Sequence, residues 1–585
     1  MKLLKAIVSS FKHTKLLILV FFLLSIALNY LVTYIPVVIQ YFIDVLLKQN
    51  TNNDIIELFI SLFNGKLSFI PIMCIFVLLI KGVIILFTYV RNVTKNKIIQ
   101  EFQFELKLKL FNHIQNLTYQ DFYKKSLAEL VQNSTDDVAN IVNVIEKQLT
   151  YILDLTLIII FAITQLASLD IRLSLVMFVS ILIIILLSIW YYIKSKPIIE
   201  NKMKVQKELY SKLNDNYSNI KFMKINNLQE KEIEKFEKVN NNNLDANKRK
   251  IVLDSFYKAS TSSVVKTQTP VIFIISSILY VNNFITIGSI YVTINYANKI
   301  TRSFTDLSEI LEVFNLCIVS CKRLNNLLNL TLEDEKSDEN IEIRDTTITF
   351  KNANIKINGK ILLSNLNFVI NPGEKVMVVG STGSGKTILL KTLIGFYEYD
   401  GSIKIGNYEI KDLNKKIIRE NMCLLLQDSY LFSRTIAENI KILMPSISMP
   451  EIIELSNFFS FHKDVQKLND GYDSQIGKNG VSLSKGQRQR LILVRAYTKP
   501  KPIMIFDDSF SAIDRINKRK ILENLLTLED DSSKIFISHE IELAPKFEKI
   551  IYINNGKVIC GTHDELLKNE NYRKIYEINL DKIGE

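Results

Sequence analysis

Long apolar runs alternate with long polar segments along the first half of the chain. A helix crosses a hydrocarbon core of about 30 Å with roughly 20 apolar residues. We expect six such helices, at 16–38, 67–90, 151–169, 173–193, 264–282 and from Ile290 past Leu311. The polar segments 91–149 and 194–263 place apolar residues at helical spacing with lysines between them, so their helices should project beyond the bilayer. The pattern predicts an all-α transmembrane domain.

The segment before the first apolar run fixes its expected orientation. Residues 1–15 carry Lys2, Lys5, Lys12 and Lys15 and lead directly into that run. Basic residues collect on the cytoplasmic side of membrane helices. Six crossings then return the chain to the cytoplasm, so we expect a multi-pass membrane protein with both termini there.

The second half follows a different pattern. An acidic, Ser- and Asp-rich stretch at 333–342 is the best linker candidate, and strand and helix patterns alternate after it. Residues 347–350 and 354–357 are expected to be strands, with a turn at Asn358-Gly359. The predicted organisation is a transmembrane domain at 1–328, a linker at 329–345 and an α/β domain at 346–585.

Residues 380–387, GSTGSGKT, fit the phosphate-binding pattern G-x-x-x-x-G-K-[ST]. An apolar strand precedes them and a helical pattern follows, which is the context that a P-loop requires. Backbone N–H groups there would surround phosphate oxygens, Lys386 would reach the β- and γ-phosphates, and Thr387 would bind Mg²⁺. The sequence therefore predicts ATP and Mg²⁺ as cofactors. The expected nucleotide-binding residues are Gly380, Ser381, Thr382, Gly383, Ser384, Gly385, Lys386 and Thr387.

Composition supports a membrane part joined to a soluble part. Hydrophobic residues make up 48% of the chain, yet 23% of its residues are charged. The net charge of +12 suggests nucleic acid as a partner. The lysines and arginines, however, flank apolar helices, where the cytoplasmic bias explains them. We therefore expect the lipid bilayer, and no nucleic acid, as a partner.

The P-loop is followed by a series of further motifs. The apolar strand 503–506 delivers Asp507, which could hold Mg²⁺ through water. The other motifs are LSKGQ at 483–487, Gln427 in LLLQDSY, Asp514, His539 in FISHE and GTHDEL at 561–566. With these motifs the chain resembles an ATP-binding cassette (ABC) protein.

The resemblance implies a role for each motif. Gln427 would sense the γ-phosphate and contact Mg²⁺, and His539 would be the switch histidine of catalysis. The signature residues Ser484, Gly486 and Gln487, with Asp514, would complete a nucleotide site. Asp508 stands at the position of the general base.

The first half resembles the six-helix membrane domain of ABC exporters. Segments near 117–123 and 220–224 would be coupling helices that rest on ATP-binding domains. One chain would then be a half-transporter that dimerises, each signature completing the ATP site of the other chain. The resemblance implies an ATPase that drives export across a bacterial plasma membrane.

Three positions depart from the family pattern. Asp508 replaces the usual glutamate, and its shorter side chain holds the carboxylate about 1–1.5 Å further back, a misplacement that can cost about 100-fold in rate. The alternative is that Asp508 works through a shifted water. Ile357 stands where an aromatic residue normally stacks on adenine, and Lys485 replaces a glycine-type position of the signature.

The sequence around Asp508 resembles the weak-site subunit of heterodimeric bacterial exporters. We therefore expect a different half-transporter as the partner, with a homodimer as the alternative. A second functional hypothesis is an ATP-binding regulatory or gating subunit that hydrolyses ATP weakly or not at all. Both hypotheses keep the ATP site and differ in its turnover.

Polar residues in the sixth expected helix bear on the cargo. At about 100° per residue they fall on a stripe roughly 80° wide, which we expect to line a central cavity. The alternative is that Arg302 and Asp306 satisfy each other within the helix. A cavity of mixed charge suits a peptide-like or amphipathic cargo. The stripe consists of Asn295, Lys299, Arg302, Asp306 and Glu309.

Overall fold

The computed structural model describes residues 2–12, 14–47, 49, 54–61, 69–305, 307–333, 341–357, 359–427, 430–477, 483–538 and 540–584. It divides into two compact units. The first unit comprises 1–115 and 125–330, and the second comprises 116–124 and 331–585. The division between Leu330 and Thr331 falls inside the expected linker, and the short segment 116–124 belongs with the second unit.

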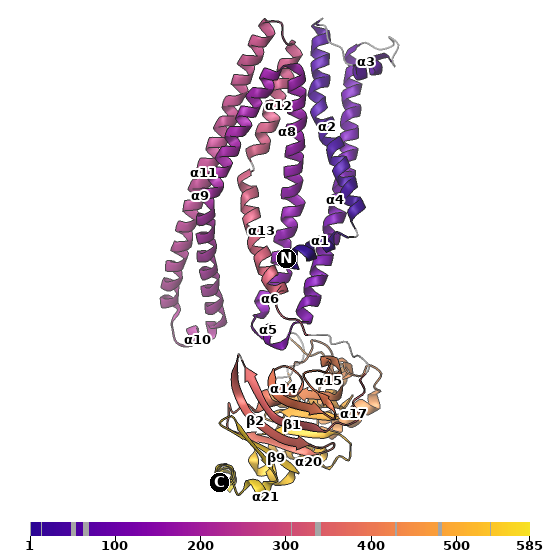
Figure 1. Cartoon of the computed structure of the whole chain (residues 1–585), viewed down its shortest axis with the longest axis vertical. Coiled ribbons are helices and arrows are strands. Elements are labelled where there is room, and N and C mark those ends of the chain that lie inside the picture. The colour runs from indigo at the N-terminus through magenta and orange to yellow at the C-terminus, as the bar shows by residue number, and fades with distance from the viewer. Residues whose placement is uncertain are drawn as a thin grey trace. The chain divides into compact units, whose positions relative to one another are not determined.

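The first unit is helical throughout its described residues (Figure 1). Its apolar segments are continuous helices because long runs of Leu, Ile, Val and Phe contain few helix breakers, and Pro36 and Pro197 are accommodated inside α2 and α9. The elements are α1 (Lys2–Ser10), α2 (Lys15–Leu46), α3 (Asp54–Ser61), α4 (Phe69–Gln115), α6 (Leu127–Ser134), α7 (Asp136–Asn143), the π-helix η1 (Val144–Leu149), α8 (Thr150–Leu169), α9 (Ile171–Ser218), α10 (Ile220–Ile225), α11 (Gln229–Val281), α12 (Ile287–Thr305) and α13 (Leu307–Leu328).

Five helical segments among the described residues are long and apolar enough to cross a membrane, namely Lys15–Leu46, Phe69–Gln115, Glu129–Leu169, Ile171–Ser218 and Gln229–Val281. They overlap the first five predicted spans. The sixth predicted span corresponds to α12 and the start of α13, which are not among the five. At 1.5 Å per residue, α9 and α11 are roughly 70–80 Å long, far more than the hydrocarbon core requires.

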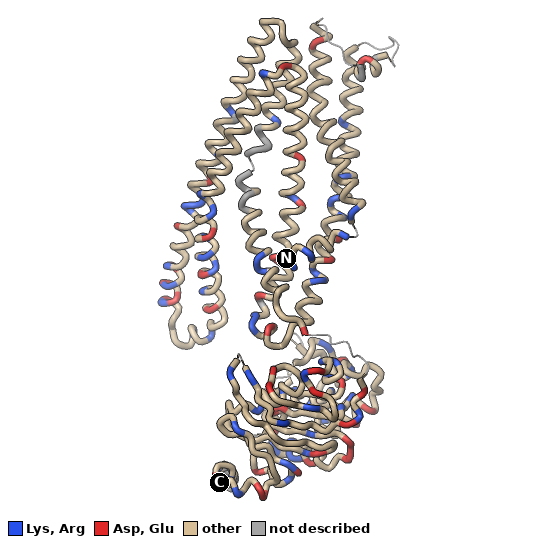
Figure 2. Tube along the Cα trace, viewed as in Figure 1, with Lys and Arg blue, Asp and Glu red and all other residues tan. Residues whose placement is uncertain are grey.

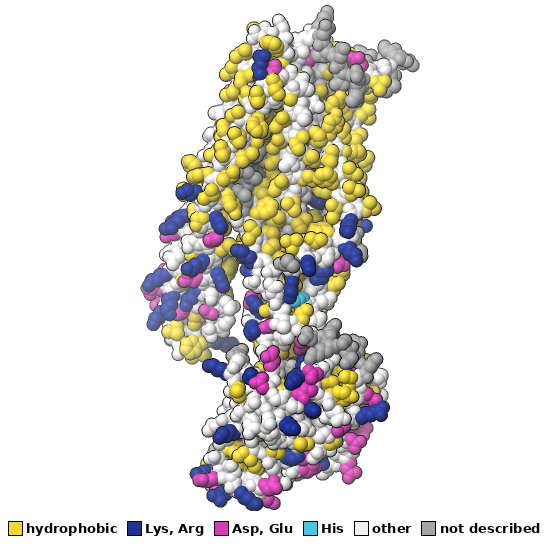
Figure 3. All heavy atoms as spheres, in the orientation of Figure 1, with side chains coloured by type: hydrophobic (Ala, Val, Ile, Leu, Met, Phe, Trp, Pro, Cys, Tyr) yellow, Lys and Arg dark blue, Asp and Glu magenta, His cyan; other side chains and the backbone are white. Residues whose placement is uncertain are grey.

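Charge divides these long helices into two parts. Lysine, arginine and acidic residues crowd one end of the helical unit, where α10 joins α9 to α11 (Figure 2). Apolar side chains cover most of the remaining helix surface that faces the viewer (Figure 3). This distribution matches helices that leave the bilayer and continue into water, as the lysine spacing predicted.

Several polar side chains inside the helical unit are paired with one another or with the backbone. Arg91 Nη1 lies 2.8 Å from Asp154 Oδ1, and the Asn29 amide donates to the same oxygen at 2.8 Å. The fully buried Asp44 accepts from Gly288 N at 2.7 Å and thereby holds the first turn of α12 to α2. Pairing is required because an unpaired polar group in an apolar environment is costly.

The second unit is α/β and contains one ten-stranded sheet, in the order β5-β4-β1-β2-β10-β9-β3-β8-β7-β6. Its strands are β1 (Ile348–Ile357), β2 (Lys360–Ile370), β3 (Lys375–Gly380), β4 (Tyr399–Ile405), β5 (Tyr408–Glu409), β6 (Met422–Leu425), β7 (Ile503–Asp507), β8 (Ser533–Ile537), β9 (Lys549–Asn554) and β10 (Lys557–Gly561). Its helices are α5 (Tyr119–Tyr123), α14 (Lys386–Leu393), α15 (Lys415–Asn421), α16 (Ile436–Lys441), α17 (Met449–Phe458), α18 (His462–Val465), α19 (Lys485–Tyr497), α20 (Arg515–Thr527), α21 (His563–Leu566) and α22 (Glu570–Gly584), with 3₁₀ turns η2 (Gly471–Asp473) and η3 (Ile541–Lys546).

Parallel strands bring the motif-bearing loops to one edge of the sheet. β3 pairs in parallel with β8, β8 with β7 and β7 with β6. The carboxyl ends of these strands therefore lie together, which is where open α/β sheets bind ligands. Their loops carry the P-loop, Asp507 and Gln427.

The sheet is buried on both faces. Met377 and Val379 of β3 pack into one apolar cluster, and Val376 and Val378 pack into another on the opposite face. An unbroken apolar run such as 376–379 is the pattern of a parallel strand covered on both sides. The core thus fixes the strand that leads into the P-loop.

One local prediction was wrong. The expected strands at 347–350 and 354–357 are a single strand, β1, which pairs with β2 along its length. Its register shifts between Phe350 and Ala353, where Asn352 has φ of +48°. Asparagine tolerates this left-handed conformation, so a bulge replaces the expected break.

Candidate nucleotide site

The P-loop joins β3 to α14 and leaves no room for side chains at its first glycine. A Cβ atom at Gly380 would lie 2.3 Å from the carbonyl oxygen of Ile553. Gly385, the N-cap of α14, has φ of +103°, a conformation that favours glycine. Ser384 Oγ is buried and has no hydrogen-bond partner among the described residues. The loop therefore offers free donors at a helix N-terminus, as phosphate binding requires.

Lys386 lies inside this loop with only 7% of its surface exposed. Its Nζ donates to the carbonyl oxygens of Gly380 at 2.8 Å and Ser381 at 2.9 Å. Burial lowers the pKa of Lys386, and the charges of Asp508 and Asp507 oppose that shift. The ammonium is therefore held beside both carboxylates at the bottom of the site.

Two of the three side chains expected at Mg²⁺, Thr387 and Asp507, are in contact. Thr387 Oγ1 donates to Asp507 Oδ1 at 3.0 Å, and Asp507 is 6% exposed at the end of β7. Gln427 lines the same cavity, which has a volume of about 500 Å³. A hydroxyl, a carboxylate and an amide oxygen are the hard ligands that Mg²⁺ prefers, so these residues fit the ion.

Asp508 lines this cavity too, with its backbone in an unusual conformation. Its φ is +48°, and its N–H donates to Ile537 O at 3.3 Å. The next residue, Ser509, is buried and donates through Oγ to Leu425 O at 2.8 Å. The turn that carries Asp508 is thereby bonded to the ends of the neighbouring strands on both sides. These bonds fix the position of the Asp508 backbone, from which its side chain extends.

The signature residues form a separate structure at the start of α19. Ser484 and Gln487 make a capping box, with Gln487 N donating to Ser484 Oγ at 3.2 Å. A Cβ at Gly486 would lie 2.6 Å from Ala512 O, so α19 packs closely on the turn that leads to Asp514. Asp514 caps α20 and accepts from Asn517 N at 3.0 Å. Its hydrogen bonds with Asn517 lower the pKa of Asp514.

Most of the sequence-predicted residues thus fall into two groups, and Gly380, Ser381 and Ser384 of the P-loop are not in the described lining. The described lining of the phosphate cavity includes Thr382, Gly383, Gly385, Lys386, Thr387, Gln427, Asp507 and Asp508. Ser484, Gly486, Gln487 and Asp514 are not part of that described lining. His539 lies outside the described residues. Lys485 is exposed, and Ile357 is half-buried at the end of β1.

Two polar residues that are not among the predicted site residues also line the cavity, Tyr123 of α5 and Lys391 of α14. Lys391 lies one helical turn beyond Thr387, so its position on the cavity side of α14 could have been inferred from the helix period. The expected coupling helix near 117–123 places Tyr123 on an ATP-binding domain, but its position at the phosphate cavity follows only from the tertiary structure.

Fold and site together define a nucleotide-binding α/β unit linked to a bundle of long apolar helices. The transmembrane region of ABC transporters matches residues 17–304, and the ABC transporter ATP-binding family matches 363–511. These matches place the chain in the ABC transporter family. This chain contains one membrane region followed by one ATP-binding cassette.

Relatives and a solved structure extend over most of the chain. An uncharacterized ABC transporter ATP-binding protein of Bacillus subtilis (strain 168), YfiB, is 28% identical over 83% of this chain and 85% of its own length. A putative multidrug export ATP-binding/permease protein of the same bacterium, YgaD, is 26% identical over 81% and 83%. A bacterial Atm1-family ABC exporter with ATP bound superposes with a TM-score of 0.82 at 18% identity, covering 96% of this chain and 99% of that one. That likeness establishes an exporter fold.

The environment of Asp507 predicts how pH affects Mg²⁺ binding. Burial raises the pKa of Asp507, so its proton competes with Mg²⁺ up to a higher pH than at an exposed aspartate. The Mg²⁺ concentration needed for half-maximal ATP binding should therefore begin to rise, as the pH is lowered, at a higher pH than an exposed aspartate would give. Equilibrium binding of labelled ATP at several Mg²⁺ concentrations measures it.

The matched control for this prediction is Asp507→Asn. In this variant, any remaining pH dependence of the required Mg²⁺ concentration reports protonation of ATP itself. The required Mg²⁺ concentration should change more steeply with pH in the wild type than in the variant. Equal slopes in the two proteins would show that Asp507 does not hold the ion.

Proposed function

We propose that this chain is one half of an ABC exporter, which dimerises and couples ATP binding and hydrolysis to outward transport. The observation that carries the proposal is the contact of Thr387 with Asp507 beside Lys386, in a cavity bounded by the P-loop. This arrangement holds the phosphates and the cation of one nucleotide. The membrane is the bacterial plasma membrane, with both termini and the ATP-binding unit on the cytoplasmic side.

Each site residue has a role in this proposal. The P-loop backbone from Gly380 to Gly385 binds the phosphates, and Lys386 neutralises their charge. Thr387, Asp507 and Gln427 hold Mg²⁺, which when bound neutralises charge that develops on the phosphate oxygens. Asp508 orients the attacking water, and His539 assists it.

The signature completes the ATP site of a second chain. Ser484, Gly486 and Gln487 stand at the N-terminus of α19, where backbone N–H groups attract anions, yet no described residue of this group lines the cavity of its own P-loop. Asp514, in the turn packed on Gly486, belongs to the same interface. In a dimer, the signature residues and Asp514 of one chain would contact the nucleotide bound at the P-loop of the other chain.

The partner in this proposal is a different half-transporter that supplies a glutamate. The short side chain of Asp508 leaves its own site slow, so the complex needs a faster one. Mass measurement of the chain purified alone in lipid, with its ATP turnover, tests this. We expect no stable, rapidly hydrolysing homodimer, and finding one would refute the heterodimer.

A second candidate function is a weakly hydrolysing or non-hydrolysing regulatory subunit. The observation in its favour is again Asp508, whose turn is held by the hydrogen bond from Ser509 Oγ to Leu425 O. In this case ATP binding alone would shift the conformational equilibrium. Transport that continues at full rate when Asp508 is replaced by asparagine would favour this function.

The cargo we propose is peptide-like or amphipathic. Lys299 of the polar stripe donates to Val32 O at 2.9 Å, and Asn295 bonds within α12. Residue 306 and the side chains of Arg302 and Glu309 lie outside the described structure. The support for a mixed-charge cavity is therefore the helical spacing of the stripe.

Neutralising the acidic part of the stripe should reduce transport of cationic cargo. We expect Asp306→Asn with Glu309→Gln to slow ATP-dependent uptake of such peptides into inverted vesicles about tenfold, the loss expected for one charged contact. The matched control is Asp245→Asn with Glu234→Gln, which neutralises two exposed acids of α11. Equal uptake by both double variants would remove the stripe from the cargo site.

A further inference from the structure

An apolar cavity lies between three segments of the helical unit. It has a volume of about 350 Å³, which falls within the range of small-ligand sites. Its walls come from the α1–α2 junction with the start of α2, from the middle of α4 and from the junction of η1 with α8, and α2 packs on both α4 and α8 (Figure 1). Side chains such as Phe22, Ile99 and Leu153 make the lining apolar, and Lys95 is the only charged residue in the described lining.

The α1–α2 junction, which forms one wall, is held on α4. The Phe11 ring stacks on that of Phe102 with centroids 4.5 Å apart. Lys109 Nζ donates to Ser9 Oγ and to Ser10 Oγ, both at 2.9 Å. These contacts keep the wall in place, so the cavity is a built feature of the helical unit.

The cavity lies where these helices pass from polar to apolar sequence. In α2 the apolar run follows residues 11–15, and in α4 the apolar run 67–90 ends shortly before Lys95. Neither 11–22 nor 92–100 contains an acidic residue, whereas Lys12, Lys15, Lys95 and Lys97 supply positive charge. Lysines at the ends of membrane helices lie at the level of the lipid headgroups, where they attract anionic lipids. This position gives the cavity access to both acyl chains and headgroups.

Lys95 combines an apolar environment with a charge. Its side chain is half-buried at the cavity, and among the described residues no carboxylate pairs with it. A lysine can lay its methylene stem along an apolar wall while its ammonium reaches the polar boundary. An anion bound at that point would stabilise the ammonium.

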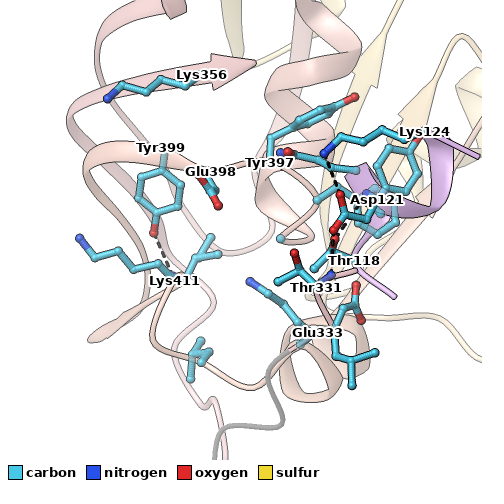
Figure 4. Close-up of a pocket in the computed structure, with 18 of the residues that line it drawn as sticks. Thr118, Asp121, Lys124, Thr331, Glu333, Lys356, Tyr397, Glu398, Tyr399 and Lys411 are labelled. Carbon is cyan, nitrogen blue, oxygen red and sulfur yellow. Dashed lines mark hydrogen bonds and ion pairs between the residues drawn. The ribbon is translucent and has the colours of Figure 1, made fainter. Parts of the chain in front are cut away.

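A polar cavity in the ATP-binding unit shows the opposite arrangement (Figure 4). Two of its lysines have carboxylates of the chain itself as partners. Lys124 Nζ donates to Asp121 Oδ1 at 2.7 Å, and Lys356 Nζ lies 2.5 Å from Asp400 Oδ2. The described lining of the apolar cavity contains no carboxylate, so an anion beside Lys95 would come from a ligand.

We propose that the apolar cavity binds one acyl chain of an anionic phospholipid, whose phosphate accepts a hydrogen bond from the Lys95 ammonium. The apolar walls bury the chain. The lysine selects a headgroup of net negative charge, because a zwitterionic headgroup carries its own cation beside the phosphate. This inference goes beyond the proposed ATP site and does not depend on it.

The bound lipid would contact the π-helix of the unit. Ile145 and Leu149, which line the cavity, belong to η1, the segment that joins α7 to α8. Short π-helical segments occur frequently at functional sites. A lipid at this point would join η1 to the α1–α2 junction on the other wall.

Quenching by brominated lipids tests the proposal, because the chain contains a single tryptophan. In a Trp190→Phe background, Phe22→Trp places the only indole at the cavity. The protein is reconstituted in mixed vesicles of phosphatidylcholine and phosphatidylglycerol, with bromine on the acyl chains of one lipid or the other. From the quenching we expect an affinity for phosphatidylglycerol about fivefold above that for phosphatidylcholine, as one lysine beside an anionic headgroup would give.

Matched variants separate this lysine from the general charge of the surface. Lys95→Gln should remove the preference for phosphatidylglycerol, and Lys95→Arg should keep it. Lys97→Gln is the control, because Lys97 is exposed on the same helix and does not line the cavity, and it should leave the preference in place. A second reporter, Phe178→Trp in the same background, lies on an exposed apolar part of α9 outside the cavity and should show little preference.

Three results would overturn the proposal. The first is equal quenching by the two brominated lipids at residue 22, and the second is an unchanged preference in Lys95→Gln. The third is a preference at residue 178 as large as that at residue 22, which would show that anionic lipid gathers around the whole helical unit without a specific site. Binding of labelled ATP by the same samples tests the proposed function separately, because the lipid site and the ATP site share no described lining residue.

Discussion

Asp508→Glu should raise the ATP turnover of the purified chain by about 100-fold, the cost that a misplacement of about 1 Å can impose. Two hydrogen bonds hold the turn that carries this aspartate. Ser509 Oγ donates to Leu425 O, and the Asp508 N–H donates to Ile537 O. Because these two hydrogen bonds hold the backbone of the turn, an added methylene carries the carboxylate toward the water. Steady-state release of phosphate in lipid measures the effect.

The control is the same change at the neighbouring residue. Asp507→Glu also adds a methylene. The Asp507 carboxylate already accepts a hydrogen bond from Thr387 at 3.0 Å, so the longer side chain would displace it from the proposed Mg²⁺ position and turnover should fall. If Asp508→Glu is no faster than wild type, Asp508 is an adequate base and the weak-site interpretation is wrong.

Gly486→Ala should lower the turnover of the complex isolated from native membranes by about 100-fold. Its Cβ would lie 2.6 Å from Ala512 O, which forces α19 away from the turn leading to Asp514. Displacement of this size in a composite site removes the alignment that catalysis requires. Binding of labelled ATP to this chain's own P-loop should persist, because Gly486 does not line that cavity.

Lys485→Ala provides the comparison, since Lys485 is exposed beside Gly486 and should change turnover little. Loss of ATP binding in Gly486→Ala, measured with the labelled nucleotide, would show that the signature supports its own P-loop. In that case the proposed exchange of signatures between chains would be incorrect.

The sequence predicted the parts of this protein that obey local rules. The apolar runs form α2, α4, α8, α9 and part of α11. A single segment in lipid can satisfy all its own backbone hydrogen bonds only as a helix. The P-loop was predictable because its chemistry needs glycines, a lysine and a threonine at fixed spacing. Asp507 followed from the apolar strand that ends in it.

The rest depended on contacts between distant segments. Tyr123 reaches the phosphate cavity because α5 is bound to residues 331–333, more than 200 positions away in the sequence. The bulge at Asn352 depends on the register of β1 with its neighbours. The pairing of Asp44 with Gly288 required the fold to bring α2 to the start of α12. Such contacts carry no periodic signal.

ATP-driven movement of cargo across the membrane tests the central claim most directly. Inverted vesicles from the native cells would be given labelled cationic peptides with Mg²⁺ and ATP, beside vesicles that carry Lys386→Ala. We predict ATP-dependent accumulation inside the wild-type vesicles and none in the variant, because the buried ammonium of Lys386 is the charge that the phosphates require. Equal accumulation in both, or ATP-dependent uptake into right-side-out vesicles instead, would contradict an exporter driven by this site.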